Sequence, residues 1–70
     1  MAKIKKFLLN GQKYYTKYNL NLFDLITYFN YNRHLLVIEH NYQIQNKKSW
    51  KNIFIKTGDK IEIVTIVGGG

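Results

Sequence analysis

The feature that most constrains this fold is a strongly apolar segment, residues 61–67, that runs directly into Gly68, Gly69 and Gly70. The β-branched side chains of this segment favour a strand, and a strand this apolar belongs in the interior of a sheet. Three glycines bury no side chain and lose much backbone entropy when ordered, so they favour a mobile tail over a packed element. The sequence therefore predicts a body whose last strand is central and is followed by a slender C-terminal tail.

Glycine in the tail also has a chemical use. Without Cβ atoms, Gly68 and Gly69 allow the chain to thread into a narrow cleft. They would then present the terminal carboxylate of Gly70 to a reactive group there. The sequence thus makes Gly70 the leading candidate for a functional residue.

The length of 70 residues limits the chain to one core, because so short a chain buries only about 60% of its unfolded surface. A hydrophobic fraction of 46% is that of a packed domain rather than a disordered segment. We expect a single domain over residues 1–67 and a flexible tail over residues 68–70, with no enclosed catalytic cleft.

Cysteine is absent, which excludes a disulfide framework, a thiolate nucleophile and a cysteine zinc site. The apolar run behind the basic N-terminus ends at Leu9, too early for a signal peptide. No run approaches the roughly 20 apolar residues that cross a membrane. We expect no membrane association, and a location in the cytoplasm or, for an organelle-encoded copy, the plastid stroma.

The formal net charge of +7 raises a nucleic-acid interpretation. The charge is scattered, however, and its densest groups lie at the N-terminus and around residues 47–51. Arg33 is the one arginine that could make bidentate contacts with phosphate. A solvated basic surface is the simpler interpretation, and we do not expect nucleic acid to be the partner.

A hairpin and a helix are predicted in the first half of the chain. The hairpin comprises strands over residues 3–9 and 12–17, joined by Asn10-Gly11, a strong turn signal. The helix should begin after Asn21, an N-cap whose capping box is completed three residues later by Asp24, and should end near residues 30–32. One helix face is apolar at positions i, i+3, i+4 and i+7 and can cover a sheet; it consists of Leu22, Leu25, Ile26 and Phe29.

The second half supplies the remaining strands. Residues 35–40 form an interior strand, residues 43–45 a brief edge strand and residues 60–67 the last strand. Residues 46–55, which include Trp50, should wrap the end of the sheet with one helical turn. This order fits an α+β fold of the β-grasp, ubiquitin-like type: a mixed sheet of four to five strands with one packed helix and the last strand beside the first.

Five segments of the chain form a recognisable set: Asn10-Gly11, Leu22-Phe23-Asp24-Leu25, Trp50, Thr57-Gly58-Asp59-Lys60-Ile61-Glu62-Ile63-Val64 and Val67-Gly68-Gly69-Gly70. With them the sequence resembles, over nearly its full length, the ThiS family of sulfur carriers of thiamin biosynthesis, which are β-grasp proteins. The last two segments together are the most specific, because a terminal Gly-Gly is shared with MoaD, Urm and ubiquitin-like proteins. The basic charge departs from the family pattern.

The resemblance implies that the chain is a co-substrate of partner enzymes rather than an enzyme. A ThiF-type adenylyltransferase, using ATP and magnesium, would activate the Gly70 carboxylate, which is ionised and unreactive at neutral pH. Sulfur from a cysteine desulfurase or another persulfide donor would then give a thiocarboxylate on Gly70. Thiazole synthase (ThiG) would receive that sulfur for the thiazole ring of thiamin. The carrier itself should bind no cofactor and be a monomer.

Docking on such partners needs an exposed apolar patch. On the last strand, Val64 and Ile66 point away from the face that Ile61 and Ile63 bury. Together with Val67 they are the candidate docking residues. The simpler interpretation is that they line the outer face of a thin sheet.

Other polar side chains receive structural interpretations. His34 and His40 have no matching carboxylate cluster, so we expect exposed or edge-strand histidines rather than metal ligands. Asp24 is interpreted as a helix cap and Asp59 as a turn former, and no catalytic residue is assigned.

Two alternatives to the thiamin carrier stay open. A carrier for molybdopterin synthesis or tRNA thiolation would use the same tail chemistry with other partners. A small basic RNA-binding module is the alternative from another class, because tyrosines on a sheet face can stack bases. In so short a chain Tyr14, Tyr15 and Tyr18 are more often core and rim packing.

Overall fold

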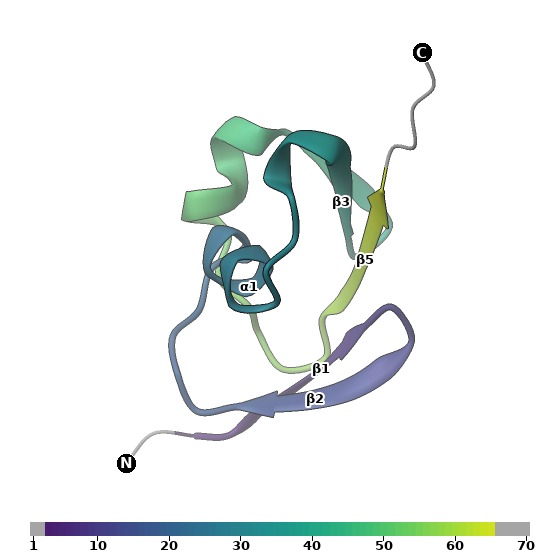
Figure 1. The fold of residues 1–70 in the computed structure, drawn as a ribbon. Helices are drawn as coiled ribbons and strands as arrows, with labels where there is room; N and C mark the ends of the chain where they lie inside the picture. The colour runs from purple at the N-terminus through teal and green to yellow at the C-terminus, as the bar shows by residue number, and fades with distance from the viewer. Residues whose placement is uncertain (1–2, 66–70) are drawn as a thin grey trace.

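The computed structural model describes residues 3–65, which form a five-stranded sheet with a helix packed across one face (Figure 1). The strands are β1 (Lys5–Leu9), β2 (Gln12–Thr16), β3 (Leu36–His40), β4 (Gln43–Gln45) and β5 (Lys60–Thr65). The helix α1 spans Leu22–Tyr28, and two 3₁₀ helices, η1 (Arg33–Leu35) and η2 (Lys47–Asn52), flank β3 and β4. This order of elements agrees with the β-grasp expectation.

The last strand is the central one. The order across the sheet is β2-β1-β5-β3-β4. β5 runs parallel to β1, with Leu9 opposite Ile61, and antiparallel to β3, with Leu36 opposite Thr65. The mixed sheet and the central position predicted for the apolar last strand are therefore confirmed. The predicted end of that strand at residue 67 lies outside the described residues.

The β1–β2 hairpin turns where the sequence predicts. Asn10 and Gly11 both have positive φ angles, 51° and 81°, which is the backbone of a type I′ turn and suits these two residue types. The strands are slightly shorter than predicted, because regular pairing begins with Lys5 opposite Thr16.

Helix α1 begins as predicted and ends early. The amide of Asp24 donates to Asn21 Oδ1 (2.7 Å) and the amide of Asn21 donates to Asp24 Oδ2 (3.2 Å), a complete capping box. At the other end, Asn30 has a left-handed φ of 59°, and the amides of Asn30 and Tyr31 donate back to Thr27 and Ile26. These two bonds form a Schellman motif, which ends the helix at Tyr28, two to four residues before the predicted end.

Two predicted segments differ in detail. The strand predicted from residue 35 begins at Leu36, because η1 precedes it and its N-cap Asn32 accepts a bond from the amide of His34. The segment around Trp50 is more regular than predicted, since η2 covers six residues rather than one turn.

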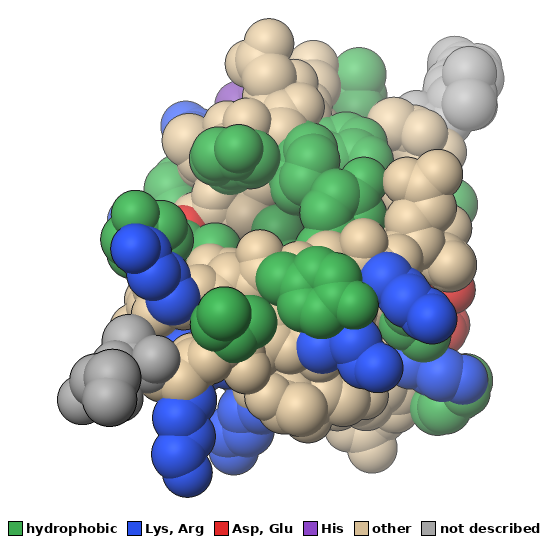
Figure 2. Space-filling view, turned by 90° about the horizontal axis from the view of Figure 1, so that it is seen from below, with side chains coloured by type: hydrophobic (Ala, Val, Ile, Leu, Met, Phe, Trp, Pro, Cys, Tyr) green, Lys and Arg blue, Asp and Glu red, His purple; other side chains and the backbone are tan. Residues whose placement is uncertain are grey.

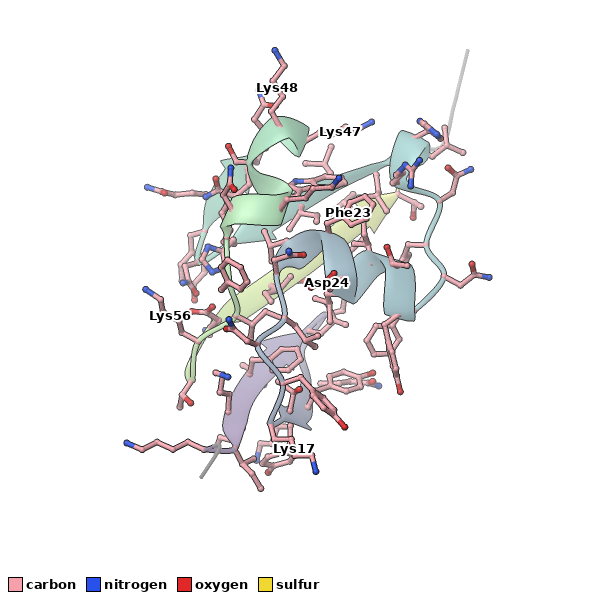
Figure 3. All side chains as sticks on the ribbon, turned by 90° about the vertical axis from the view of Figure 1, so that its left-hand side faces the viewer. Lys17, Phe23, Asp24, Lys47, Lys48 and Lys56 are labelled. Carbon is pink, nitrogen blue, oxygen red and sulfur yellow. The ribbon has the colours of Figure 1, made fainter. Side chains whose placement is uncertain are left out.

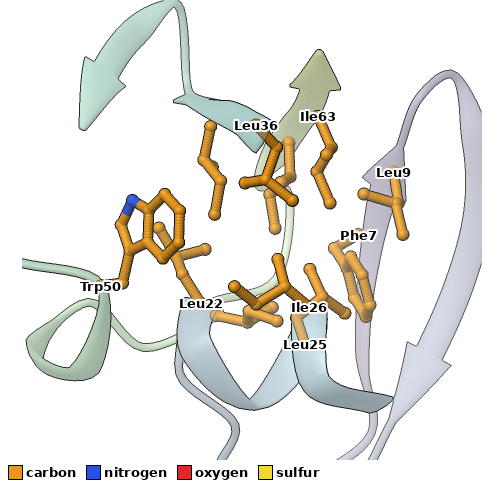
Figure 4. Packing of buried hydrophobic residues seen from close by; sticks show 11 residues of the cluster. Phe7, Leu9, Leu22, Leu25, Ile26, Leu36, Trp50 and Ile63 are labelled. Atoms are coloured by element: carbon orange, nitrogen blue, oxygen red, sulfur yellow. The ribbon is translucent and has the colours of Figure 1, made fainter. Parts of the chain in front are cut away.

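The core lies between α1 and the inner face of the sheet (Figure 4). Its buried hydrophobic residues are Phe7, Leu9, Leu22, Leu25, Ile26, Leu36, Ile38, Trp50, Ile55, Ile61 and Ile63. Each large apolar side chain buried in this way contributes about 1.5–3 kcal/mol relative to exposure. Trp50 is buried without an unpaired indole N–H, because its Nε1 donates to the carbonyl of Gln45 (3.2 Å). Phe29, predicted on the buried helix face, is only partly buried and caps the helix instead.

Candidate functional site

Strand β5 leads to the residues predicted to carry the chemistry, and two asparagine turns hold its first half. Asn10 Oδ1 accepts from the amide of Ile63 (2.7 Å), and Asn41 Oδ1 accepts from the amide of Lys60 (2.8 Å). Asn10 and Asn41 each have a φ of 51°, a backbone that asparagine adopts more readily than most side chains. The strand is thus fastened from both neighbouring hairpins.

Asp59, directly before β5, is the centre of a buried polar cluster. Only 6% of its surface is exposed. Its carboxylate accepts from Asn41 Nδ2 (3.0 Å) and from the amide of Lys56 (2.8 Å), and it lies 3.0 Å from His40 Nε2. Burial raises the pKa of this carboxyl group, but the hydrogen bonds from Asn41, His40 and Lys56 outweigh burial and hold the pKa below its ordinary value. Asp59 is therefore ionised and fully bonded, and does more than form the predicted turn.

The expectation for the histidines is wrong for one of them. His40 is partly buried on β3, an interior strand, and pairs with Asp59. The carboxylate of Asp59 pairs with the imidazole of His40, so the polar ring is not left without a partner when it is partly buried. His34 is exposed on η1, as expected. Within residues 3–65 no three His, Asp or Glu side chains gather as they would around a metal ion.

The outer face of the sheet carries the one candidate docking residue that the structure describes. Val64 is 58% exposed and stands opposite Val37. On the same face, Glu39 lies opposite both Glu62 and the exposed Ile44. This face therefore combines the apolar side chains of Val64 and Ile44 with the facing carboxylates of Glu39 and Glu62. This placement fits a docking surface and equally fits the simpler interpretation of an outer sheet face.

The remaining candidate residues lie outside the described part of the chain. They are Ile66 and Val67, proposed for docking, and Gly68, Gly69 and Gly70, proposed as the tail and its reactive end. Their roles stay predictions.

Aromatic side chains line a groove of about 520 Å³ between β2 and α1. Tyr14 is partly buried there, with its ring 6.0 Å from that of Phe7 and 5.3 Å from that of Phe29. Tyr15 and Tyr18 are exposed at the rim. Figure 2, which views the molecule from the side of the hairpin, shows hydrophobic side chains (green) among basic side chains (blue). These positions agree with the core and rim packing expected for the tyrosines.

Sequence reasoning missed the asparagine contacts and the buried cluster. A turn of Asn10-Gly11 predicts the left-handed backbone but not that the amide oxygen reaches β5. Asn41 and Asp59 are 18 positions apart, and no spacing rule links them. A charged residue just before the most apolar strand was the only available signal for Asp59.

No helix within residues 3–65 has the length and apolar character needed to cross a membrane.

Comparisons with known proteins identify a family and two relatives. The model of the ThiS family matches residues 7–70. A protein of Trieres chinensis named "Uncharacterized protein ycf40" is 59% identical over 73 residues, covering 100% of both chains. A protein of the same name from Porphyra purpurea is 34% identical over 62 residues, covering 89% of this chain and 87% of its own.

Among solved structures, the crystal structure of the thiamine biosynthesis protein (ThiS) from Geobacter metallireducens superposes with a TM-score of 0.79. The match covers 93% of this chain and 99% of that one, at 20% identity. At this identity the likeness concerns the fold alone, and it confirms the β-grasp architecture.

Proposed function

Because this chain belongs to the ThiS family, we propose that it is a sulfur carrier protein of thiamin biosynthesis whose working group is the carboxylate of Gly70. The observation that carries the proposal is the position of β5. The strand that leads to Gly70 is central in the sheet and is fastened at its start by Asn10 and Asn41. A rigid body that ends in a held strand suits a chain whose reactive end must be delivered to another protein.

The proposed chemistry begins with activation. A carboxylate oxygen of Gly70 attacks the α-phosphorus of ATP in a ThiF-type adenylyltransferase that also holds magnesium. Pyrophosphate leaves and an acyl-adenylate forms. Activation is required because an ionised carboxylate is a poor acceptor for a sulfur nucleophile.

Sulfur then replaces oxygen in two steps. The outer sulfur of a cysteine persulfide, formed by a cysteine desulfurase or another donor, attacks the acyl carbon, and AMP leaves. The resulting acyl disulfide is cleaved by a second thiol, which forms a disulfide with the donor cysteine and leaves a thiocarboxylate on Gly70. Thiazole synthase (ThiG) is the proposed acceptor of that sulfur. The chain is a co-substrate throughout and binds no cofactor itself.

Docking in this proposal uses the outer sheet face around Val64, with Ile66 and Val67 continuing toward the tail. The exposure of Val64, and of Ile44 two strands away on the same face, supports this surface. Lack of side-chain bulk at Gly68 and Gly69 suits entry into a narrow active site.

For the compartment we propose the plastid stroma. Support comes from the two relatives named ycf40, a name of the kind given to plastid reading frames. Cell fractionation should recover the protein with stromal markers, whereas recovery with cytosolic markers would contradict this assignment.

Mass spectrometry tests the carrier function directly. After incubation with ATP, magnesium, the adenylyltransferase and a persulfide donor, the protein should gain one sulfur in exchange for one oxygen at Gly70. An unchanged mass with partners that load another ThiS protein would refute the proposal. Expression of the protein in mutant strains then identifies the pathway. Restored growth of a thiazole auxotroph would indicate thiamin synthesis, whereas restored molybdopterin synthesis or tRNA thiolation would indicate one of the alternatives.

A further inference from the structure

A basic pocket lies away from the outer face of the sheet, and the proposed sulfur chemistry gives it no role. It has a volume of about 350 Å³ and lies where α1, η1 and η2 meet. Four cationic side chains, Arg33, Lys47, Lys48 and Lys51, surround it next to Phe23. These four side chains and Phe23 are called the basic pocket below.

Phe23 holds two of the cations in place. The guanidinium carbon of Arg33 lies 5.5 Å from the centroid of the Phe23 ring, and Lys51 Nζ lies 4.8 Å from it. Both contacts are cation–π interactions, which attract positive groups to the ring face. The ring thereby keeps two like charges together that would otherwise separate, so an anion-binding arrangement exists before any partner arrives.

No carboxylate within residues 3–65 forms an ion pair with these cations. Asp24 follows Phe23 directly, but its Oδ2 accepts from the amide of Asn21 in the capping box. Figure 3 shows Phe23 and Asp24 on α1, with Lys47 and Lys48 extending from η2 above them. The positive charge of the basic pocket is therefore available to a partner.

The basic pocket lies at the end of the sheet from which the chain continues to Gly70. Arg33 belongs to η1, which directly precedes β3, and the first residue of β3, Leu36, pairs with Thr65. Thr65 is the last described residue of β5. An enzyme that binds the residues after Thr65 must approach this end of the molecule.

We propose that the basic pocket binds a carboxylate-rich surface of the adenylyltransferase while the tail occupies its active site. This inference rests on the carrier function proposed above and names the surface that aligns carrier and enzyme. Opposite charges that meet in this way mainly accelerate association and fix orientation.

An acidic protein surface fits the basic pocket better than a nucleic acid does. Base stacking needs an aromatic face that is free. The ring of Phe23 is occupied by two cations, and Trp50, which lines the pocket, is only 2% exposed. The attraction that remains is one of charge.

Association kinetics with the purified adenylyltransferase of the same organism test the proposal. The test variant is Lys47→Gln/Lys48→Gln, and the control is Lys6→Gln/Lys13→Gln, which removes the same charge from exposed lysines of the hairpin. At low ionic strength the test variant should associate about tenfold more slowly than the wild type. The control should stay within about twofold, and the difference should shrink as salt is added.

Equal slowing of both variants would assign the effect to overall charge and overturn the proposal, as would no slowing of either. Binding to a single-stranded RNA oligonucleotide forms a second arm. Loss of RNA binding in the test variant, with unchanged enzyme association, would assign the basic pocket to nucleic acid and refute the proposal.

A loading assay with excess enzyme separates this inference from the carrier function. Wild type and both variants should all reach full thiocarboxylate formation, the test variant more slowly. A wild type that is never loaded would refute the carrier function and this inference with it. Loading of all three proteins at one rate would refute this inference alone.

Discussion

The side-chain oxygen of Asn10 accepts a hydrogen bond of 2.7 Å from the amide of Ile63, 53 positions further along the chain. The parallel ladder between β1 and β5 comprises only two residue pairs, Leu8 with Lys60 and Leu9 with Ile61. The contact from Asn10 extends that short ladder toward the C-terminal half of β5. The turn residue therefore ties the hairpin to the strand that leads to Gly70.

Replacing Asn10 should weaken the fold by removing this acceptor. Asn10→Gly keeps the left-handed backbone accessible but loses the bond to Ile63, and should lower the free energy of unfolding by about 1–2 kcal/mol. Asn10→Asp keeps an oxygen acceptor and serves as the control, with a smaller loss. Urea denaturation followed by circular dichroism measures both, and equal stability of the glycine variant and the wild type would contradict the assigned role.

Asp59 should make the stability of the fold depend on pH in the acid range. Because the pKa of Asp59 is lower in the folded chain than in the unfolded one, its stabilising effect is complete above the unfolded pKa of about 4. The effect is lost as pH falls from the unfolded pKa through the lower folded pKa. Below the folded pKa the carboxyl group is protonated in both states, so unfolding no longer takes up a proton there.

Asp59→Asn tests this dependence. At neutral pH it should lower the free energy of unfolding by about 1–3 kcal/mol, since His40 and Lys56 lose a charged acceptor. It should also flatten the decline in stability between about pH 5 and pH 2. Thr57→Ser in the same turn is the control and should keep the decline. Thermal melts across that range provide the measurement, and an unchanged slope in Asp59→Asn would show that other groups cause it.

Removal of Gly70 should abolish loading with sulfur while leaving the fold intact. The acyl-adenylate would have to form on Gly69, one residue short of the position that the adenylyltransferase reaches. Adding one alanine after Gly70 should have the same effect, since it moves the carboxylate by one residue. Mass spectrometry after the loading reaction gives the readout, and unchanged unfolding curves confirm that the body is intact.

The same deletion separates the carrier from an RNA-binding module. Salt-dependent RNA affinity arises from the basic body and should survive loss of Gly70. Sulfur loading that persisted without Gly70 would be incompatible with the proposed function.

Val64 should contribute to partner binding and little to stability. Val64→Thr keeps β-branching and nearly the same shape but adds a hydroxyl to the exposed sheet face. It should raise the KM of the loading reaction for the carrier several-fold, on the order of 1 kcal/mol in binding, and change kcat less. Ile4→Thr, at another exposed position outside the strands, is the control. A KM that responds equally to both variants would remove Val64 from the docking surface.

The local features of this protein could be predicted from the sequence because they depend on neighbours in the chain. The capping box of Asn21 and Asp24 joins residues three positions apart, and the turn of Asn10-Gly11 depends on which side chains tolerate positive φ. The central strand could be predicted from alternation of Ile61 and Ile63, since so apolar a strand is stable only inside a sheet. The early end of α1 was not predicted, because Asn30 allows a Schellman turn without requiring it.

The sequence by itself determined the β-grasp order of elements, because hydrophobic period and residue type are properties of short segments; the glycine tail stays a prediction. Only the tertiary structure decided which distant polar groups meet. His40 and Asp59 are separated by 19 positions, and Arg33 and Lys51 converge on one aromatic ring from different 3₁₀ helices. Such contacts arise when the sheet closes around the core, and their geometry is set by strand register and loop path rather than by spacing along the chain.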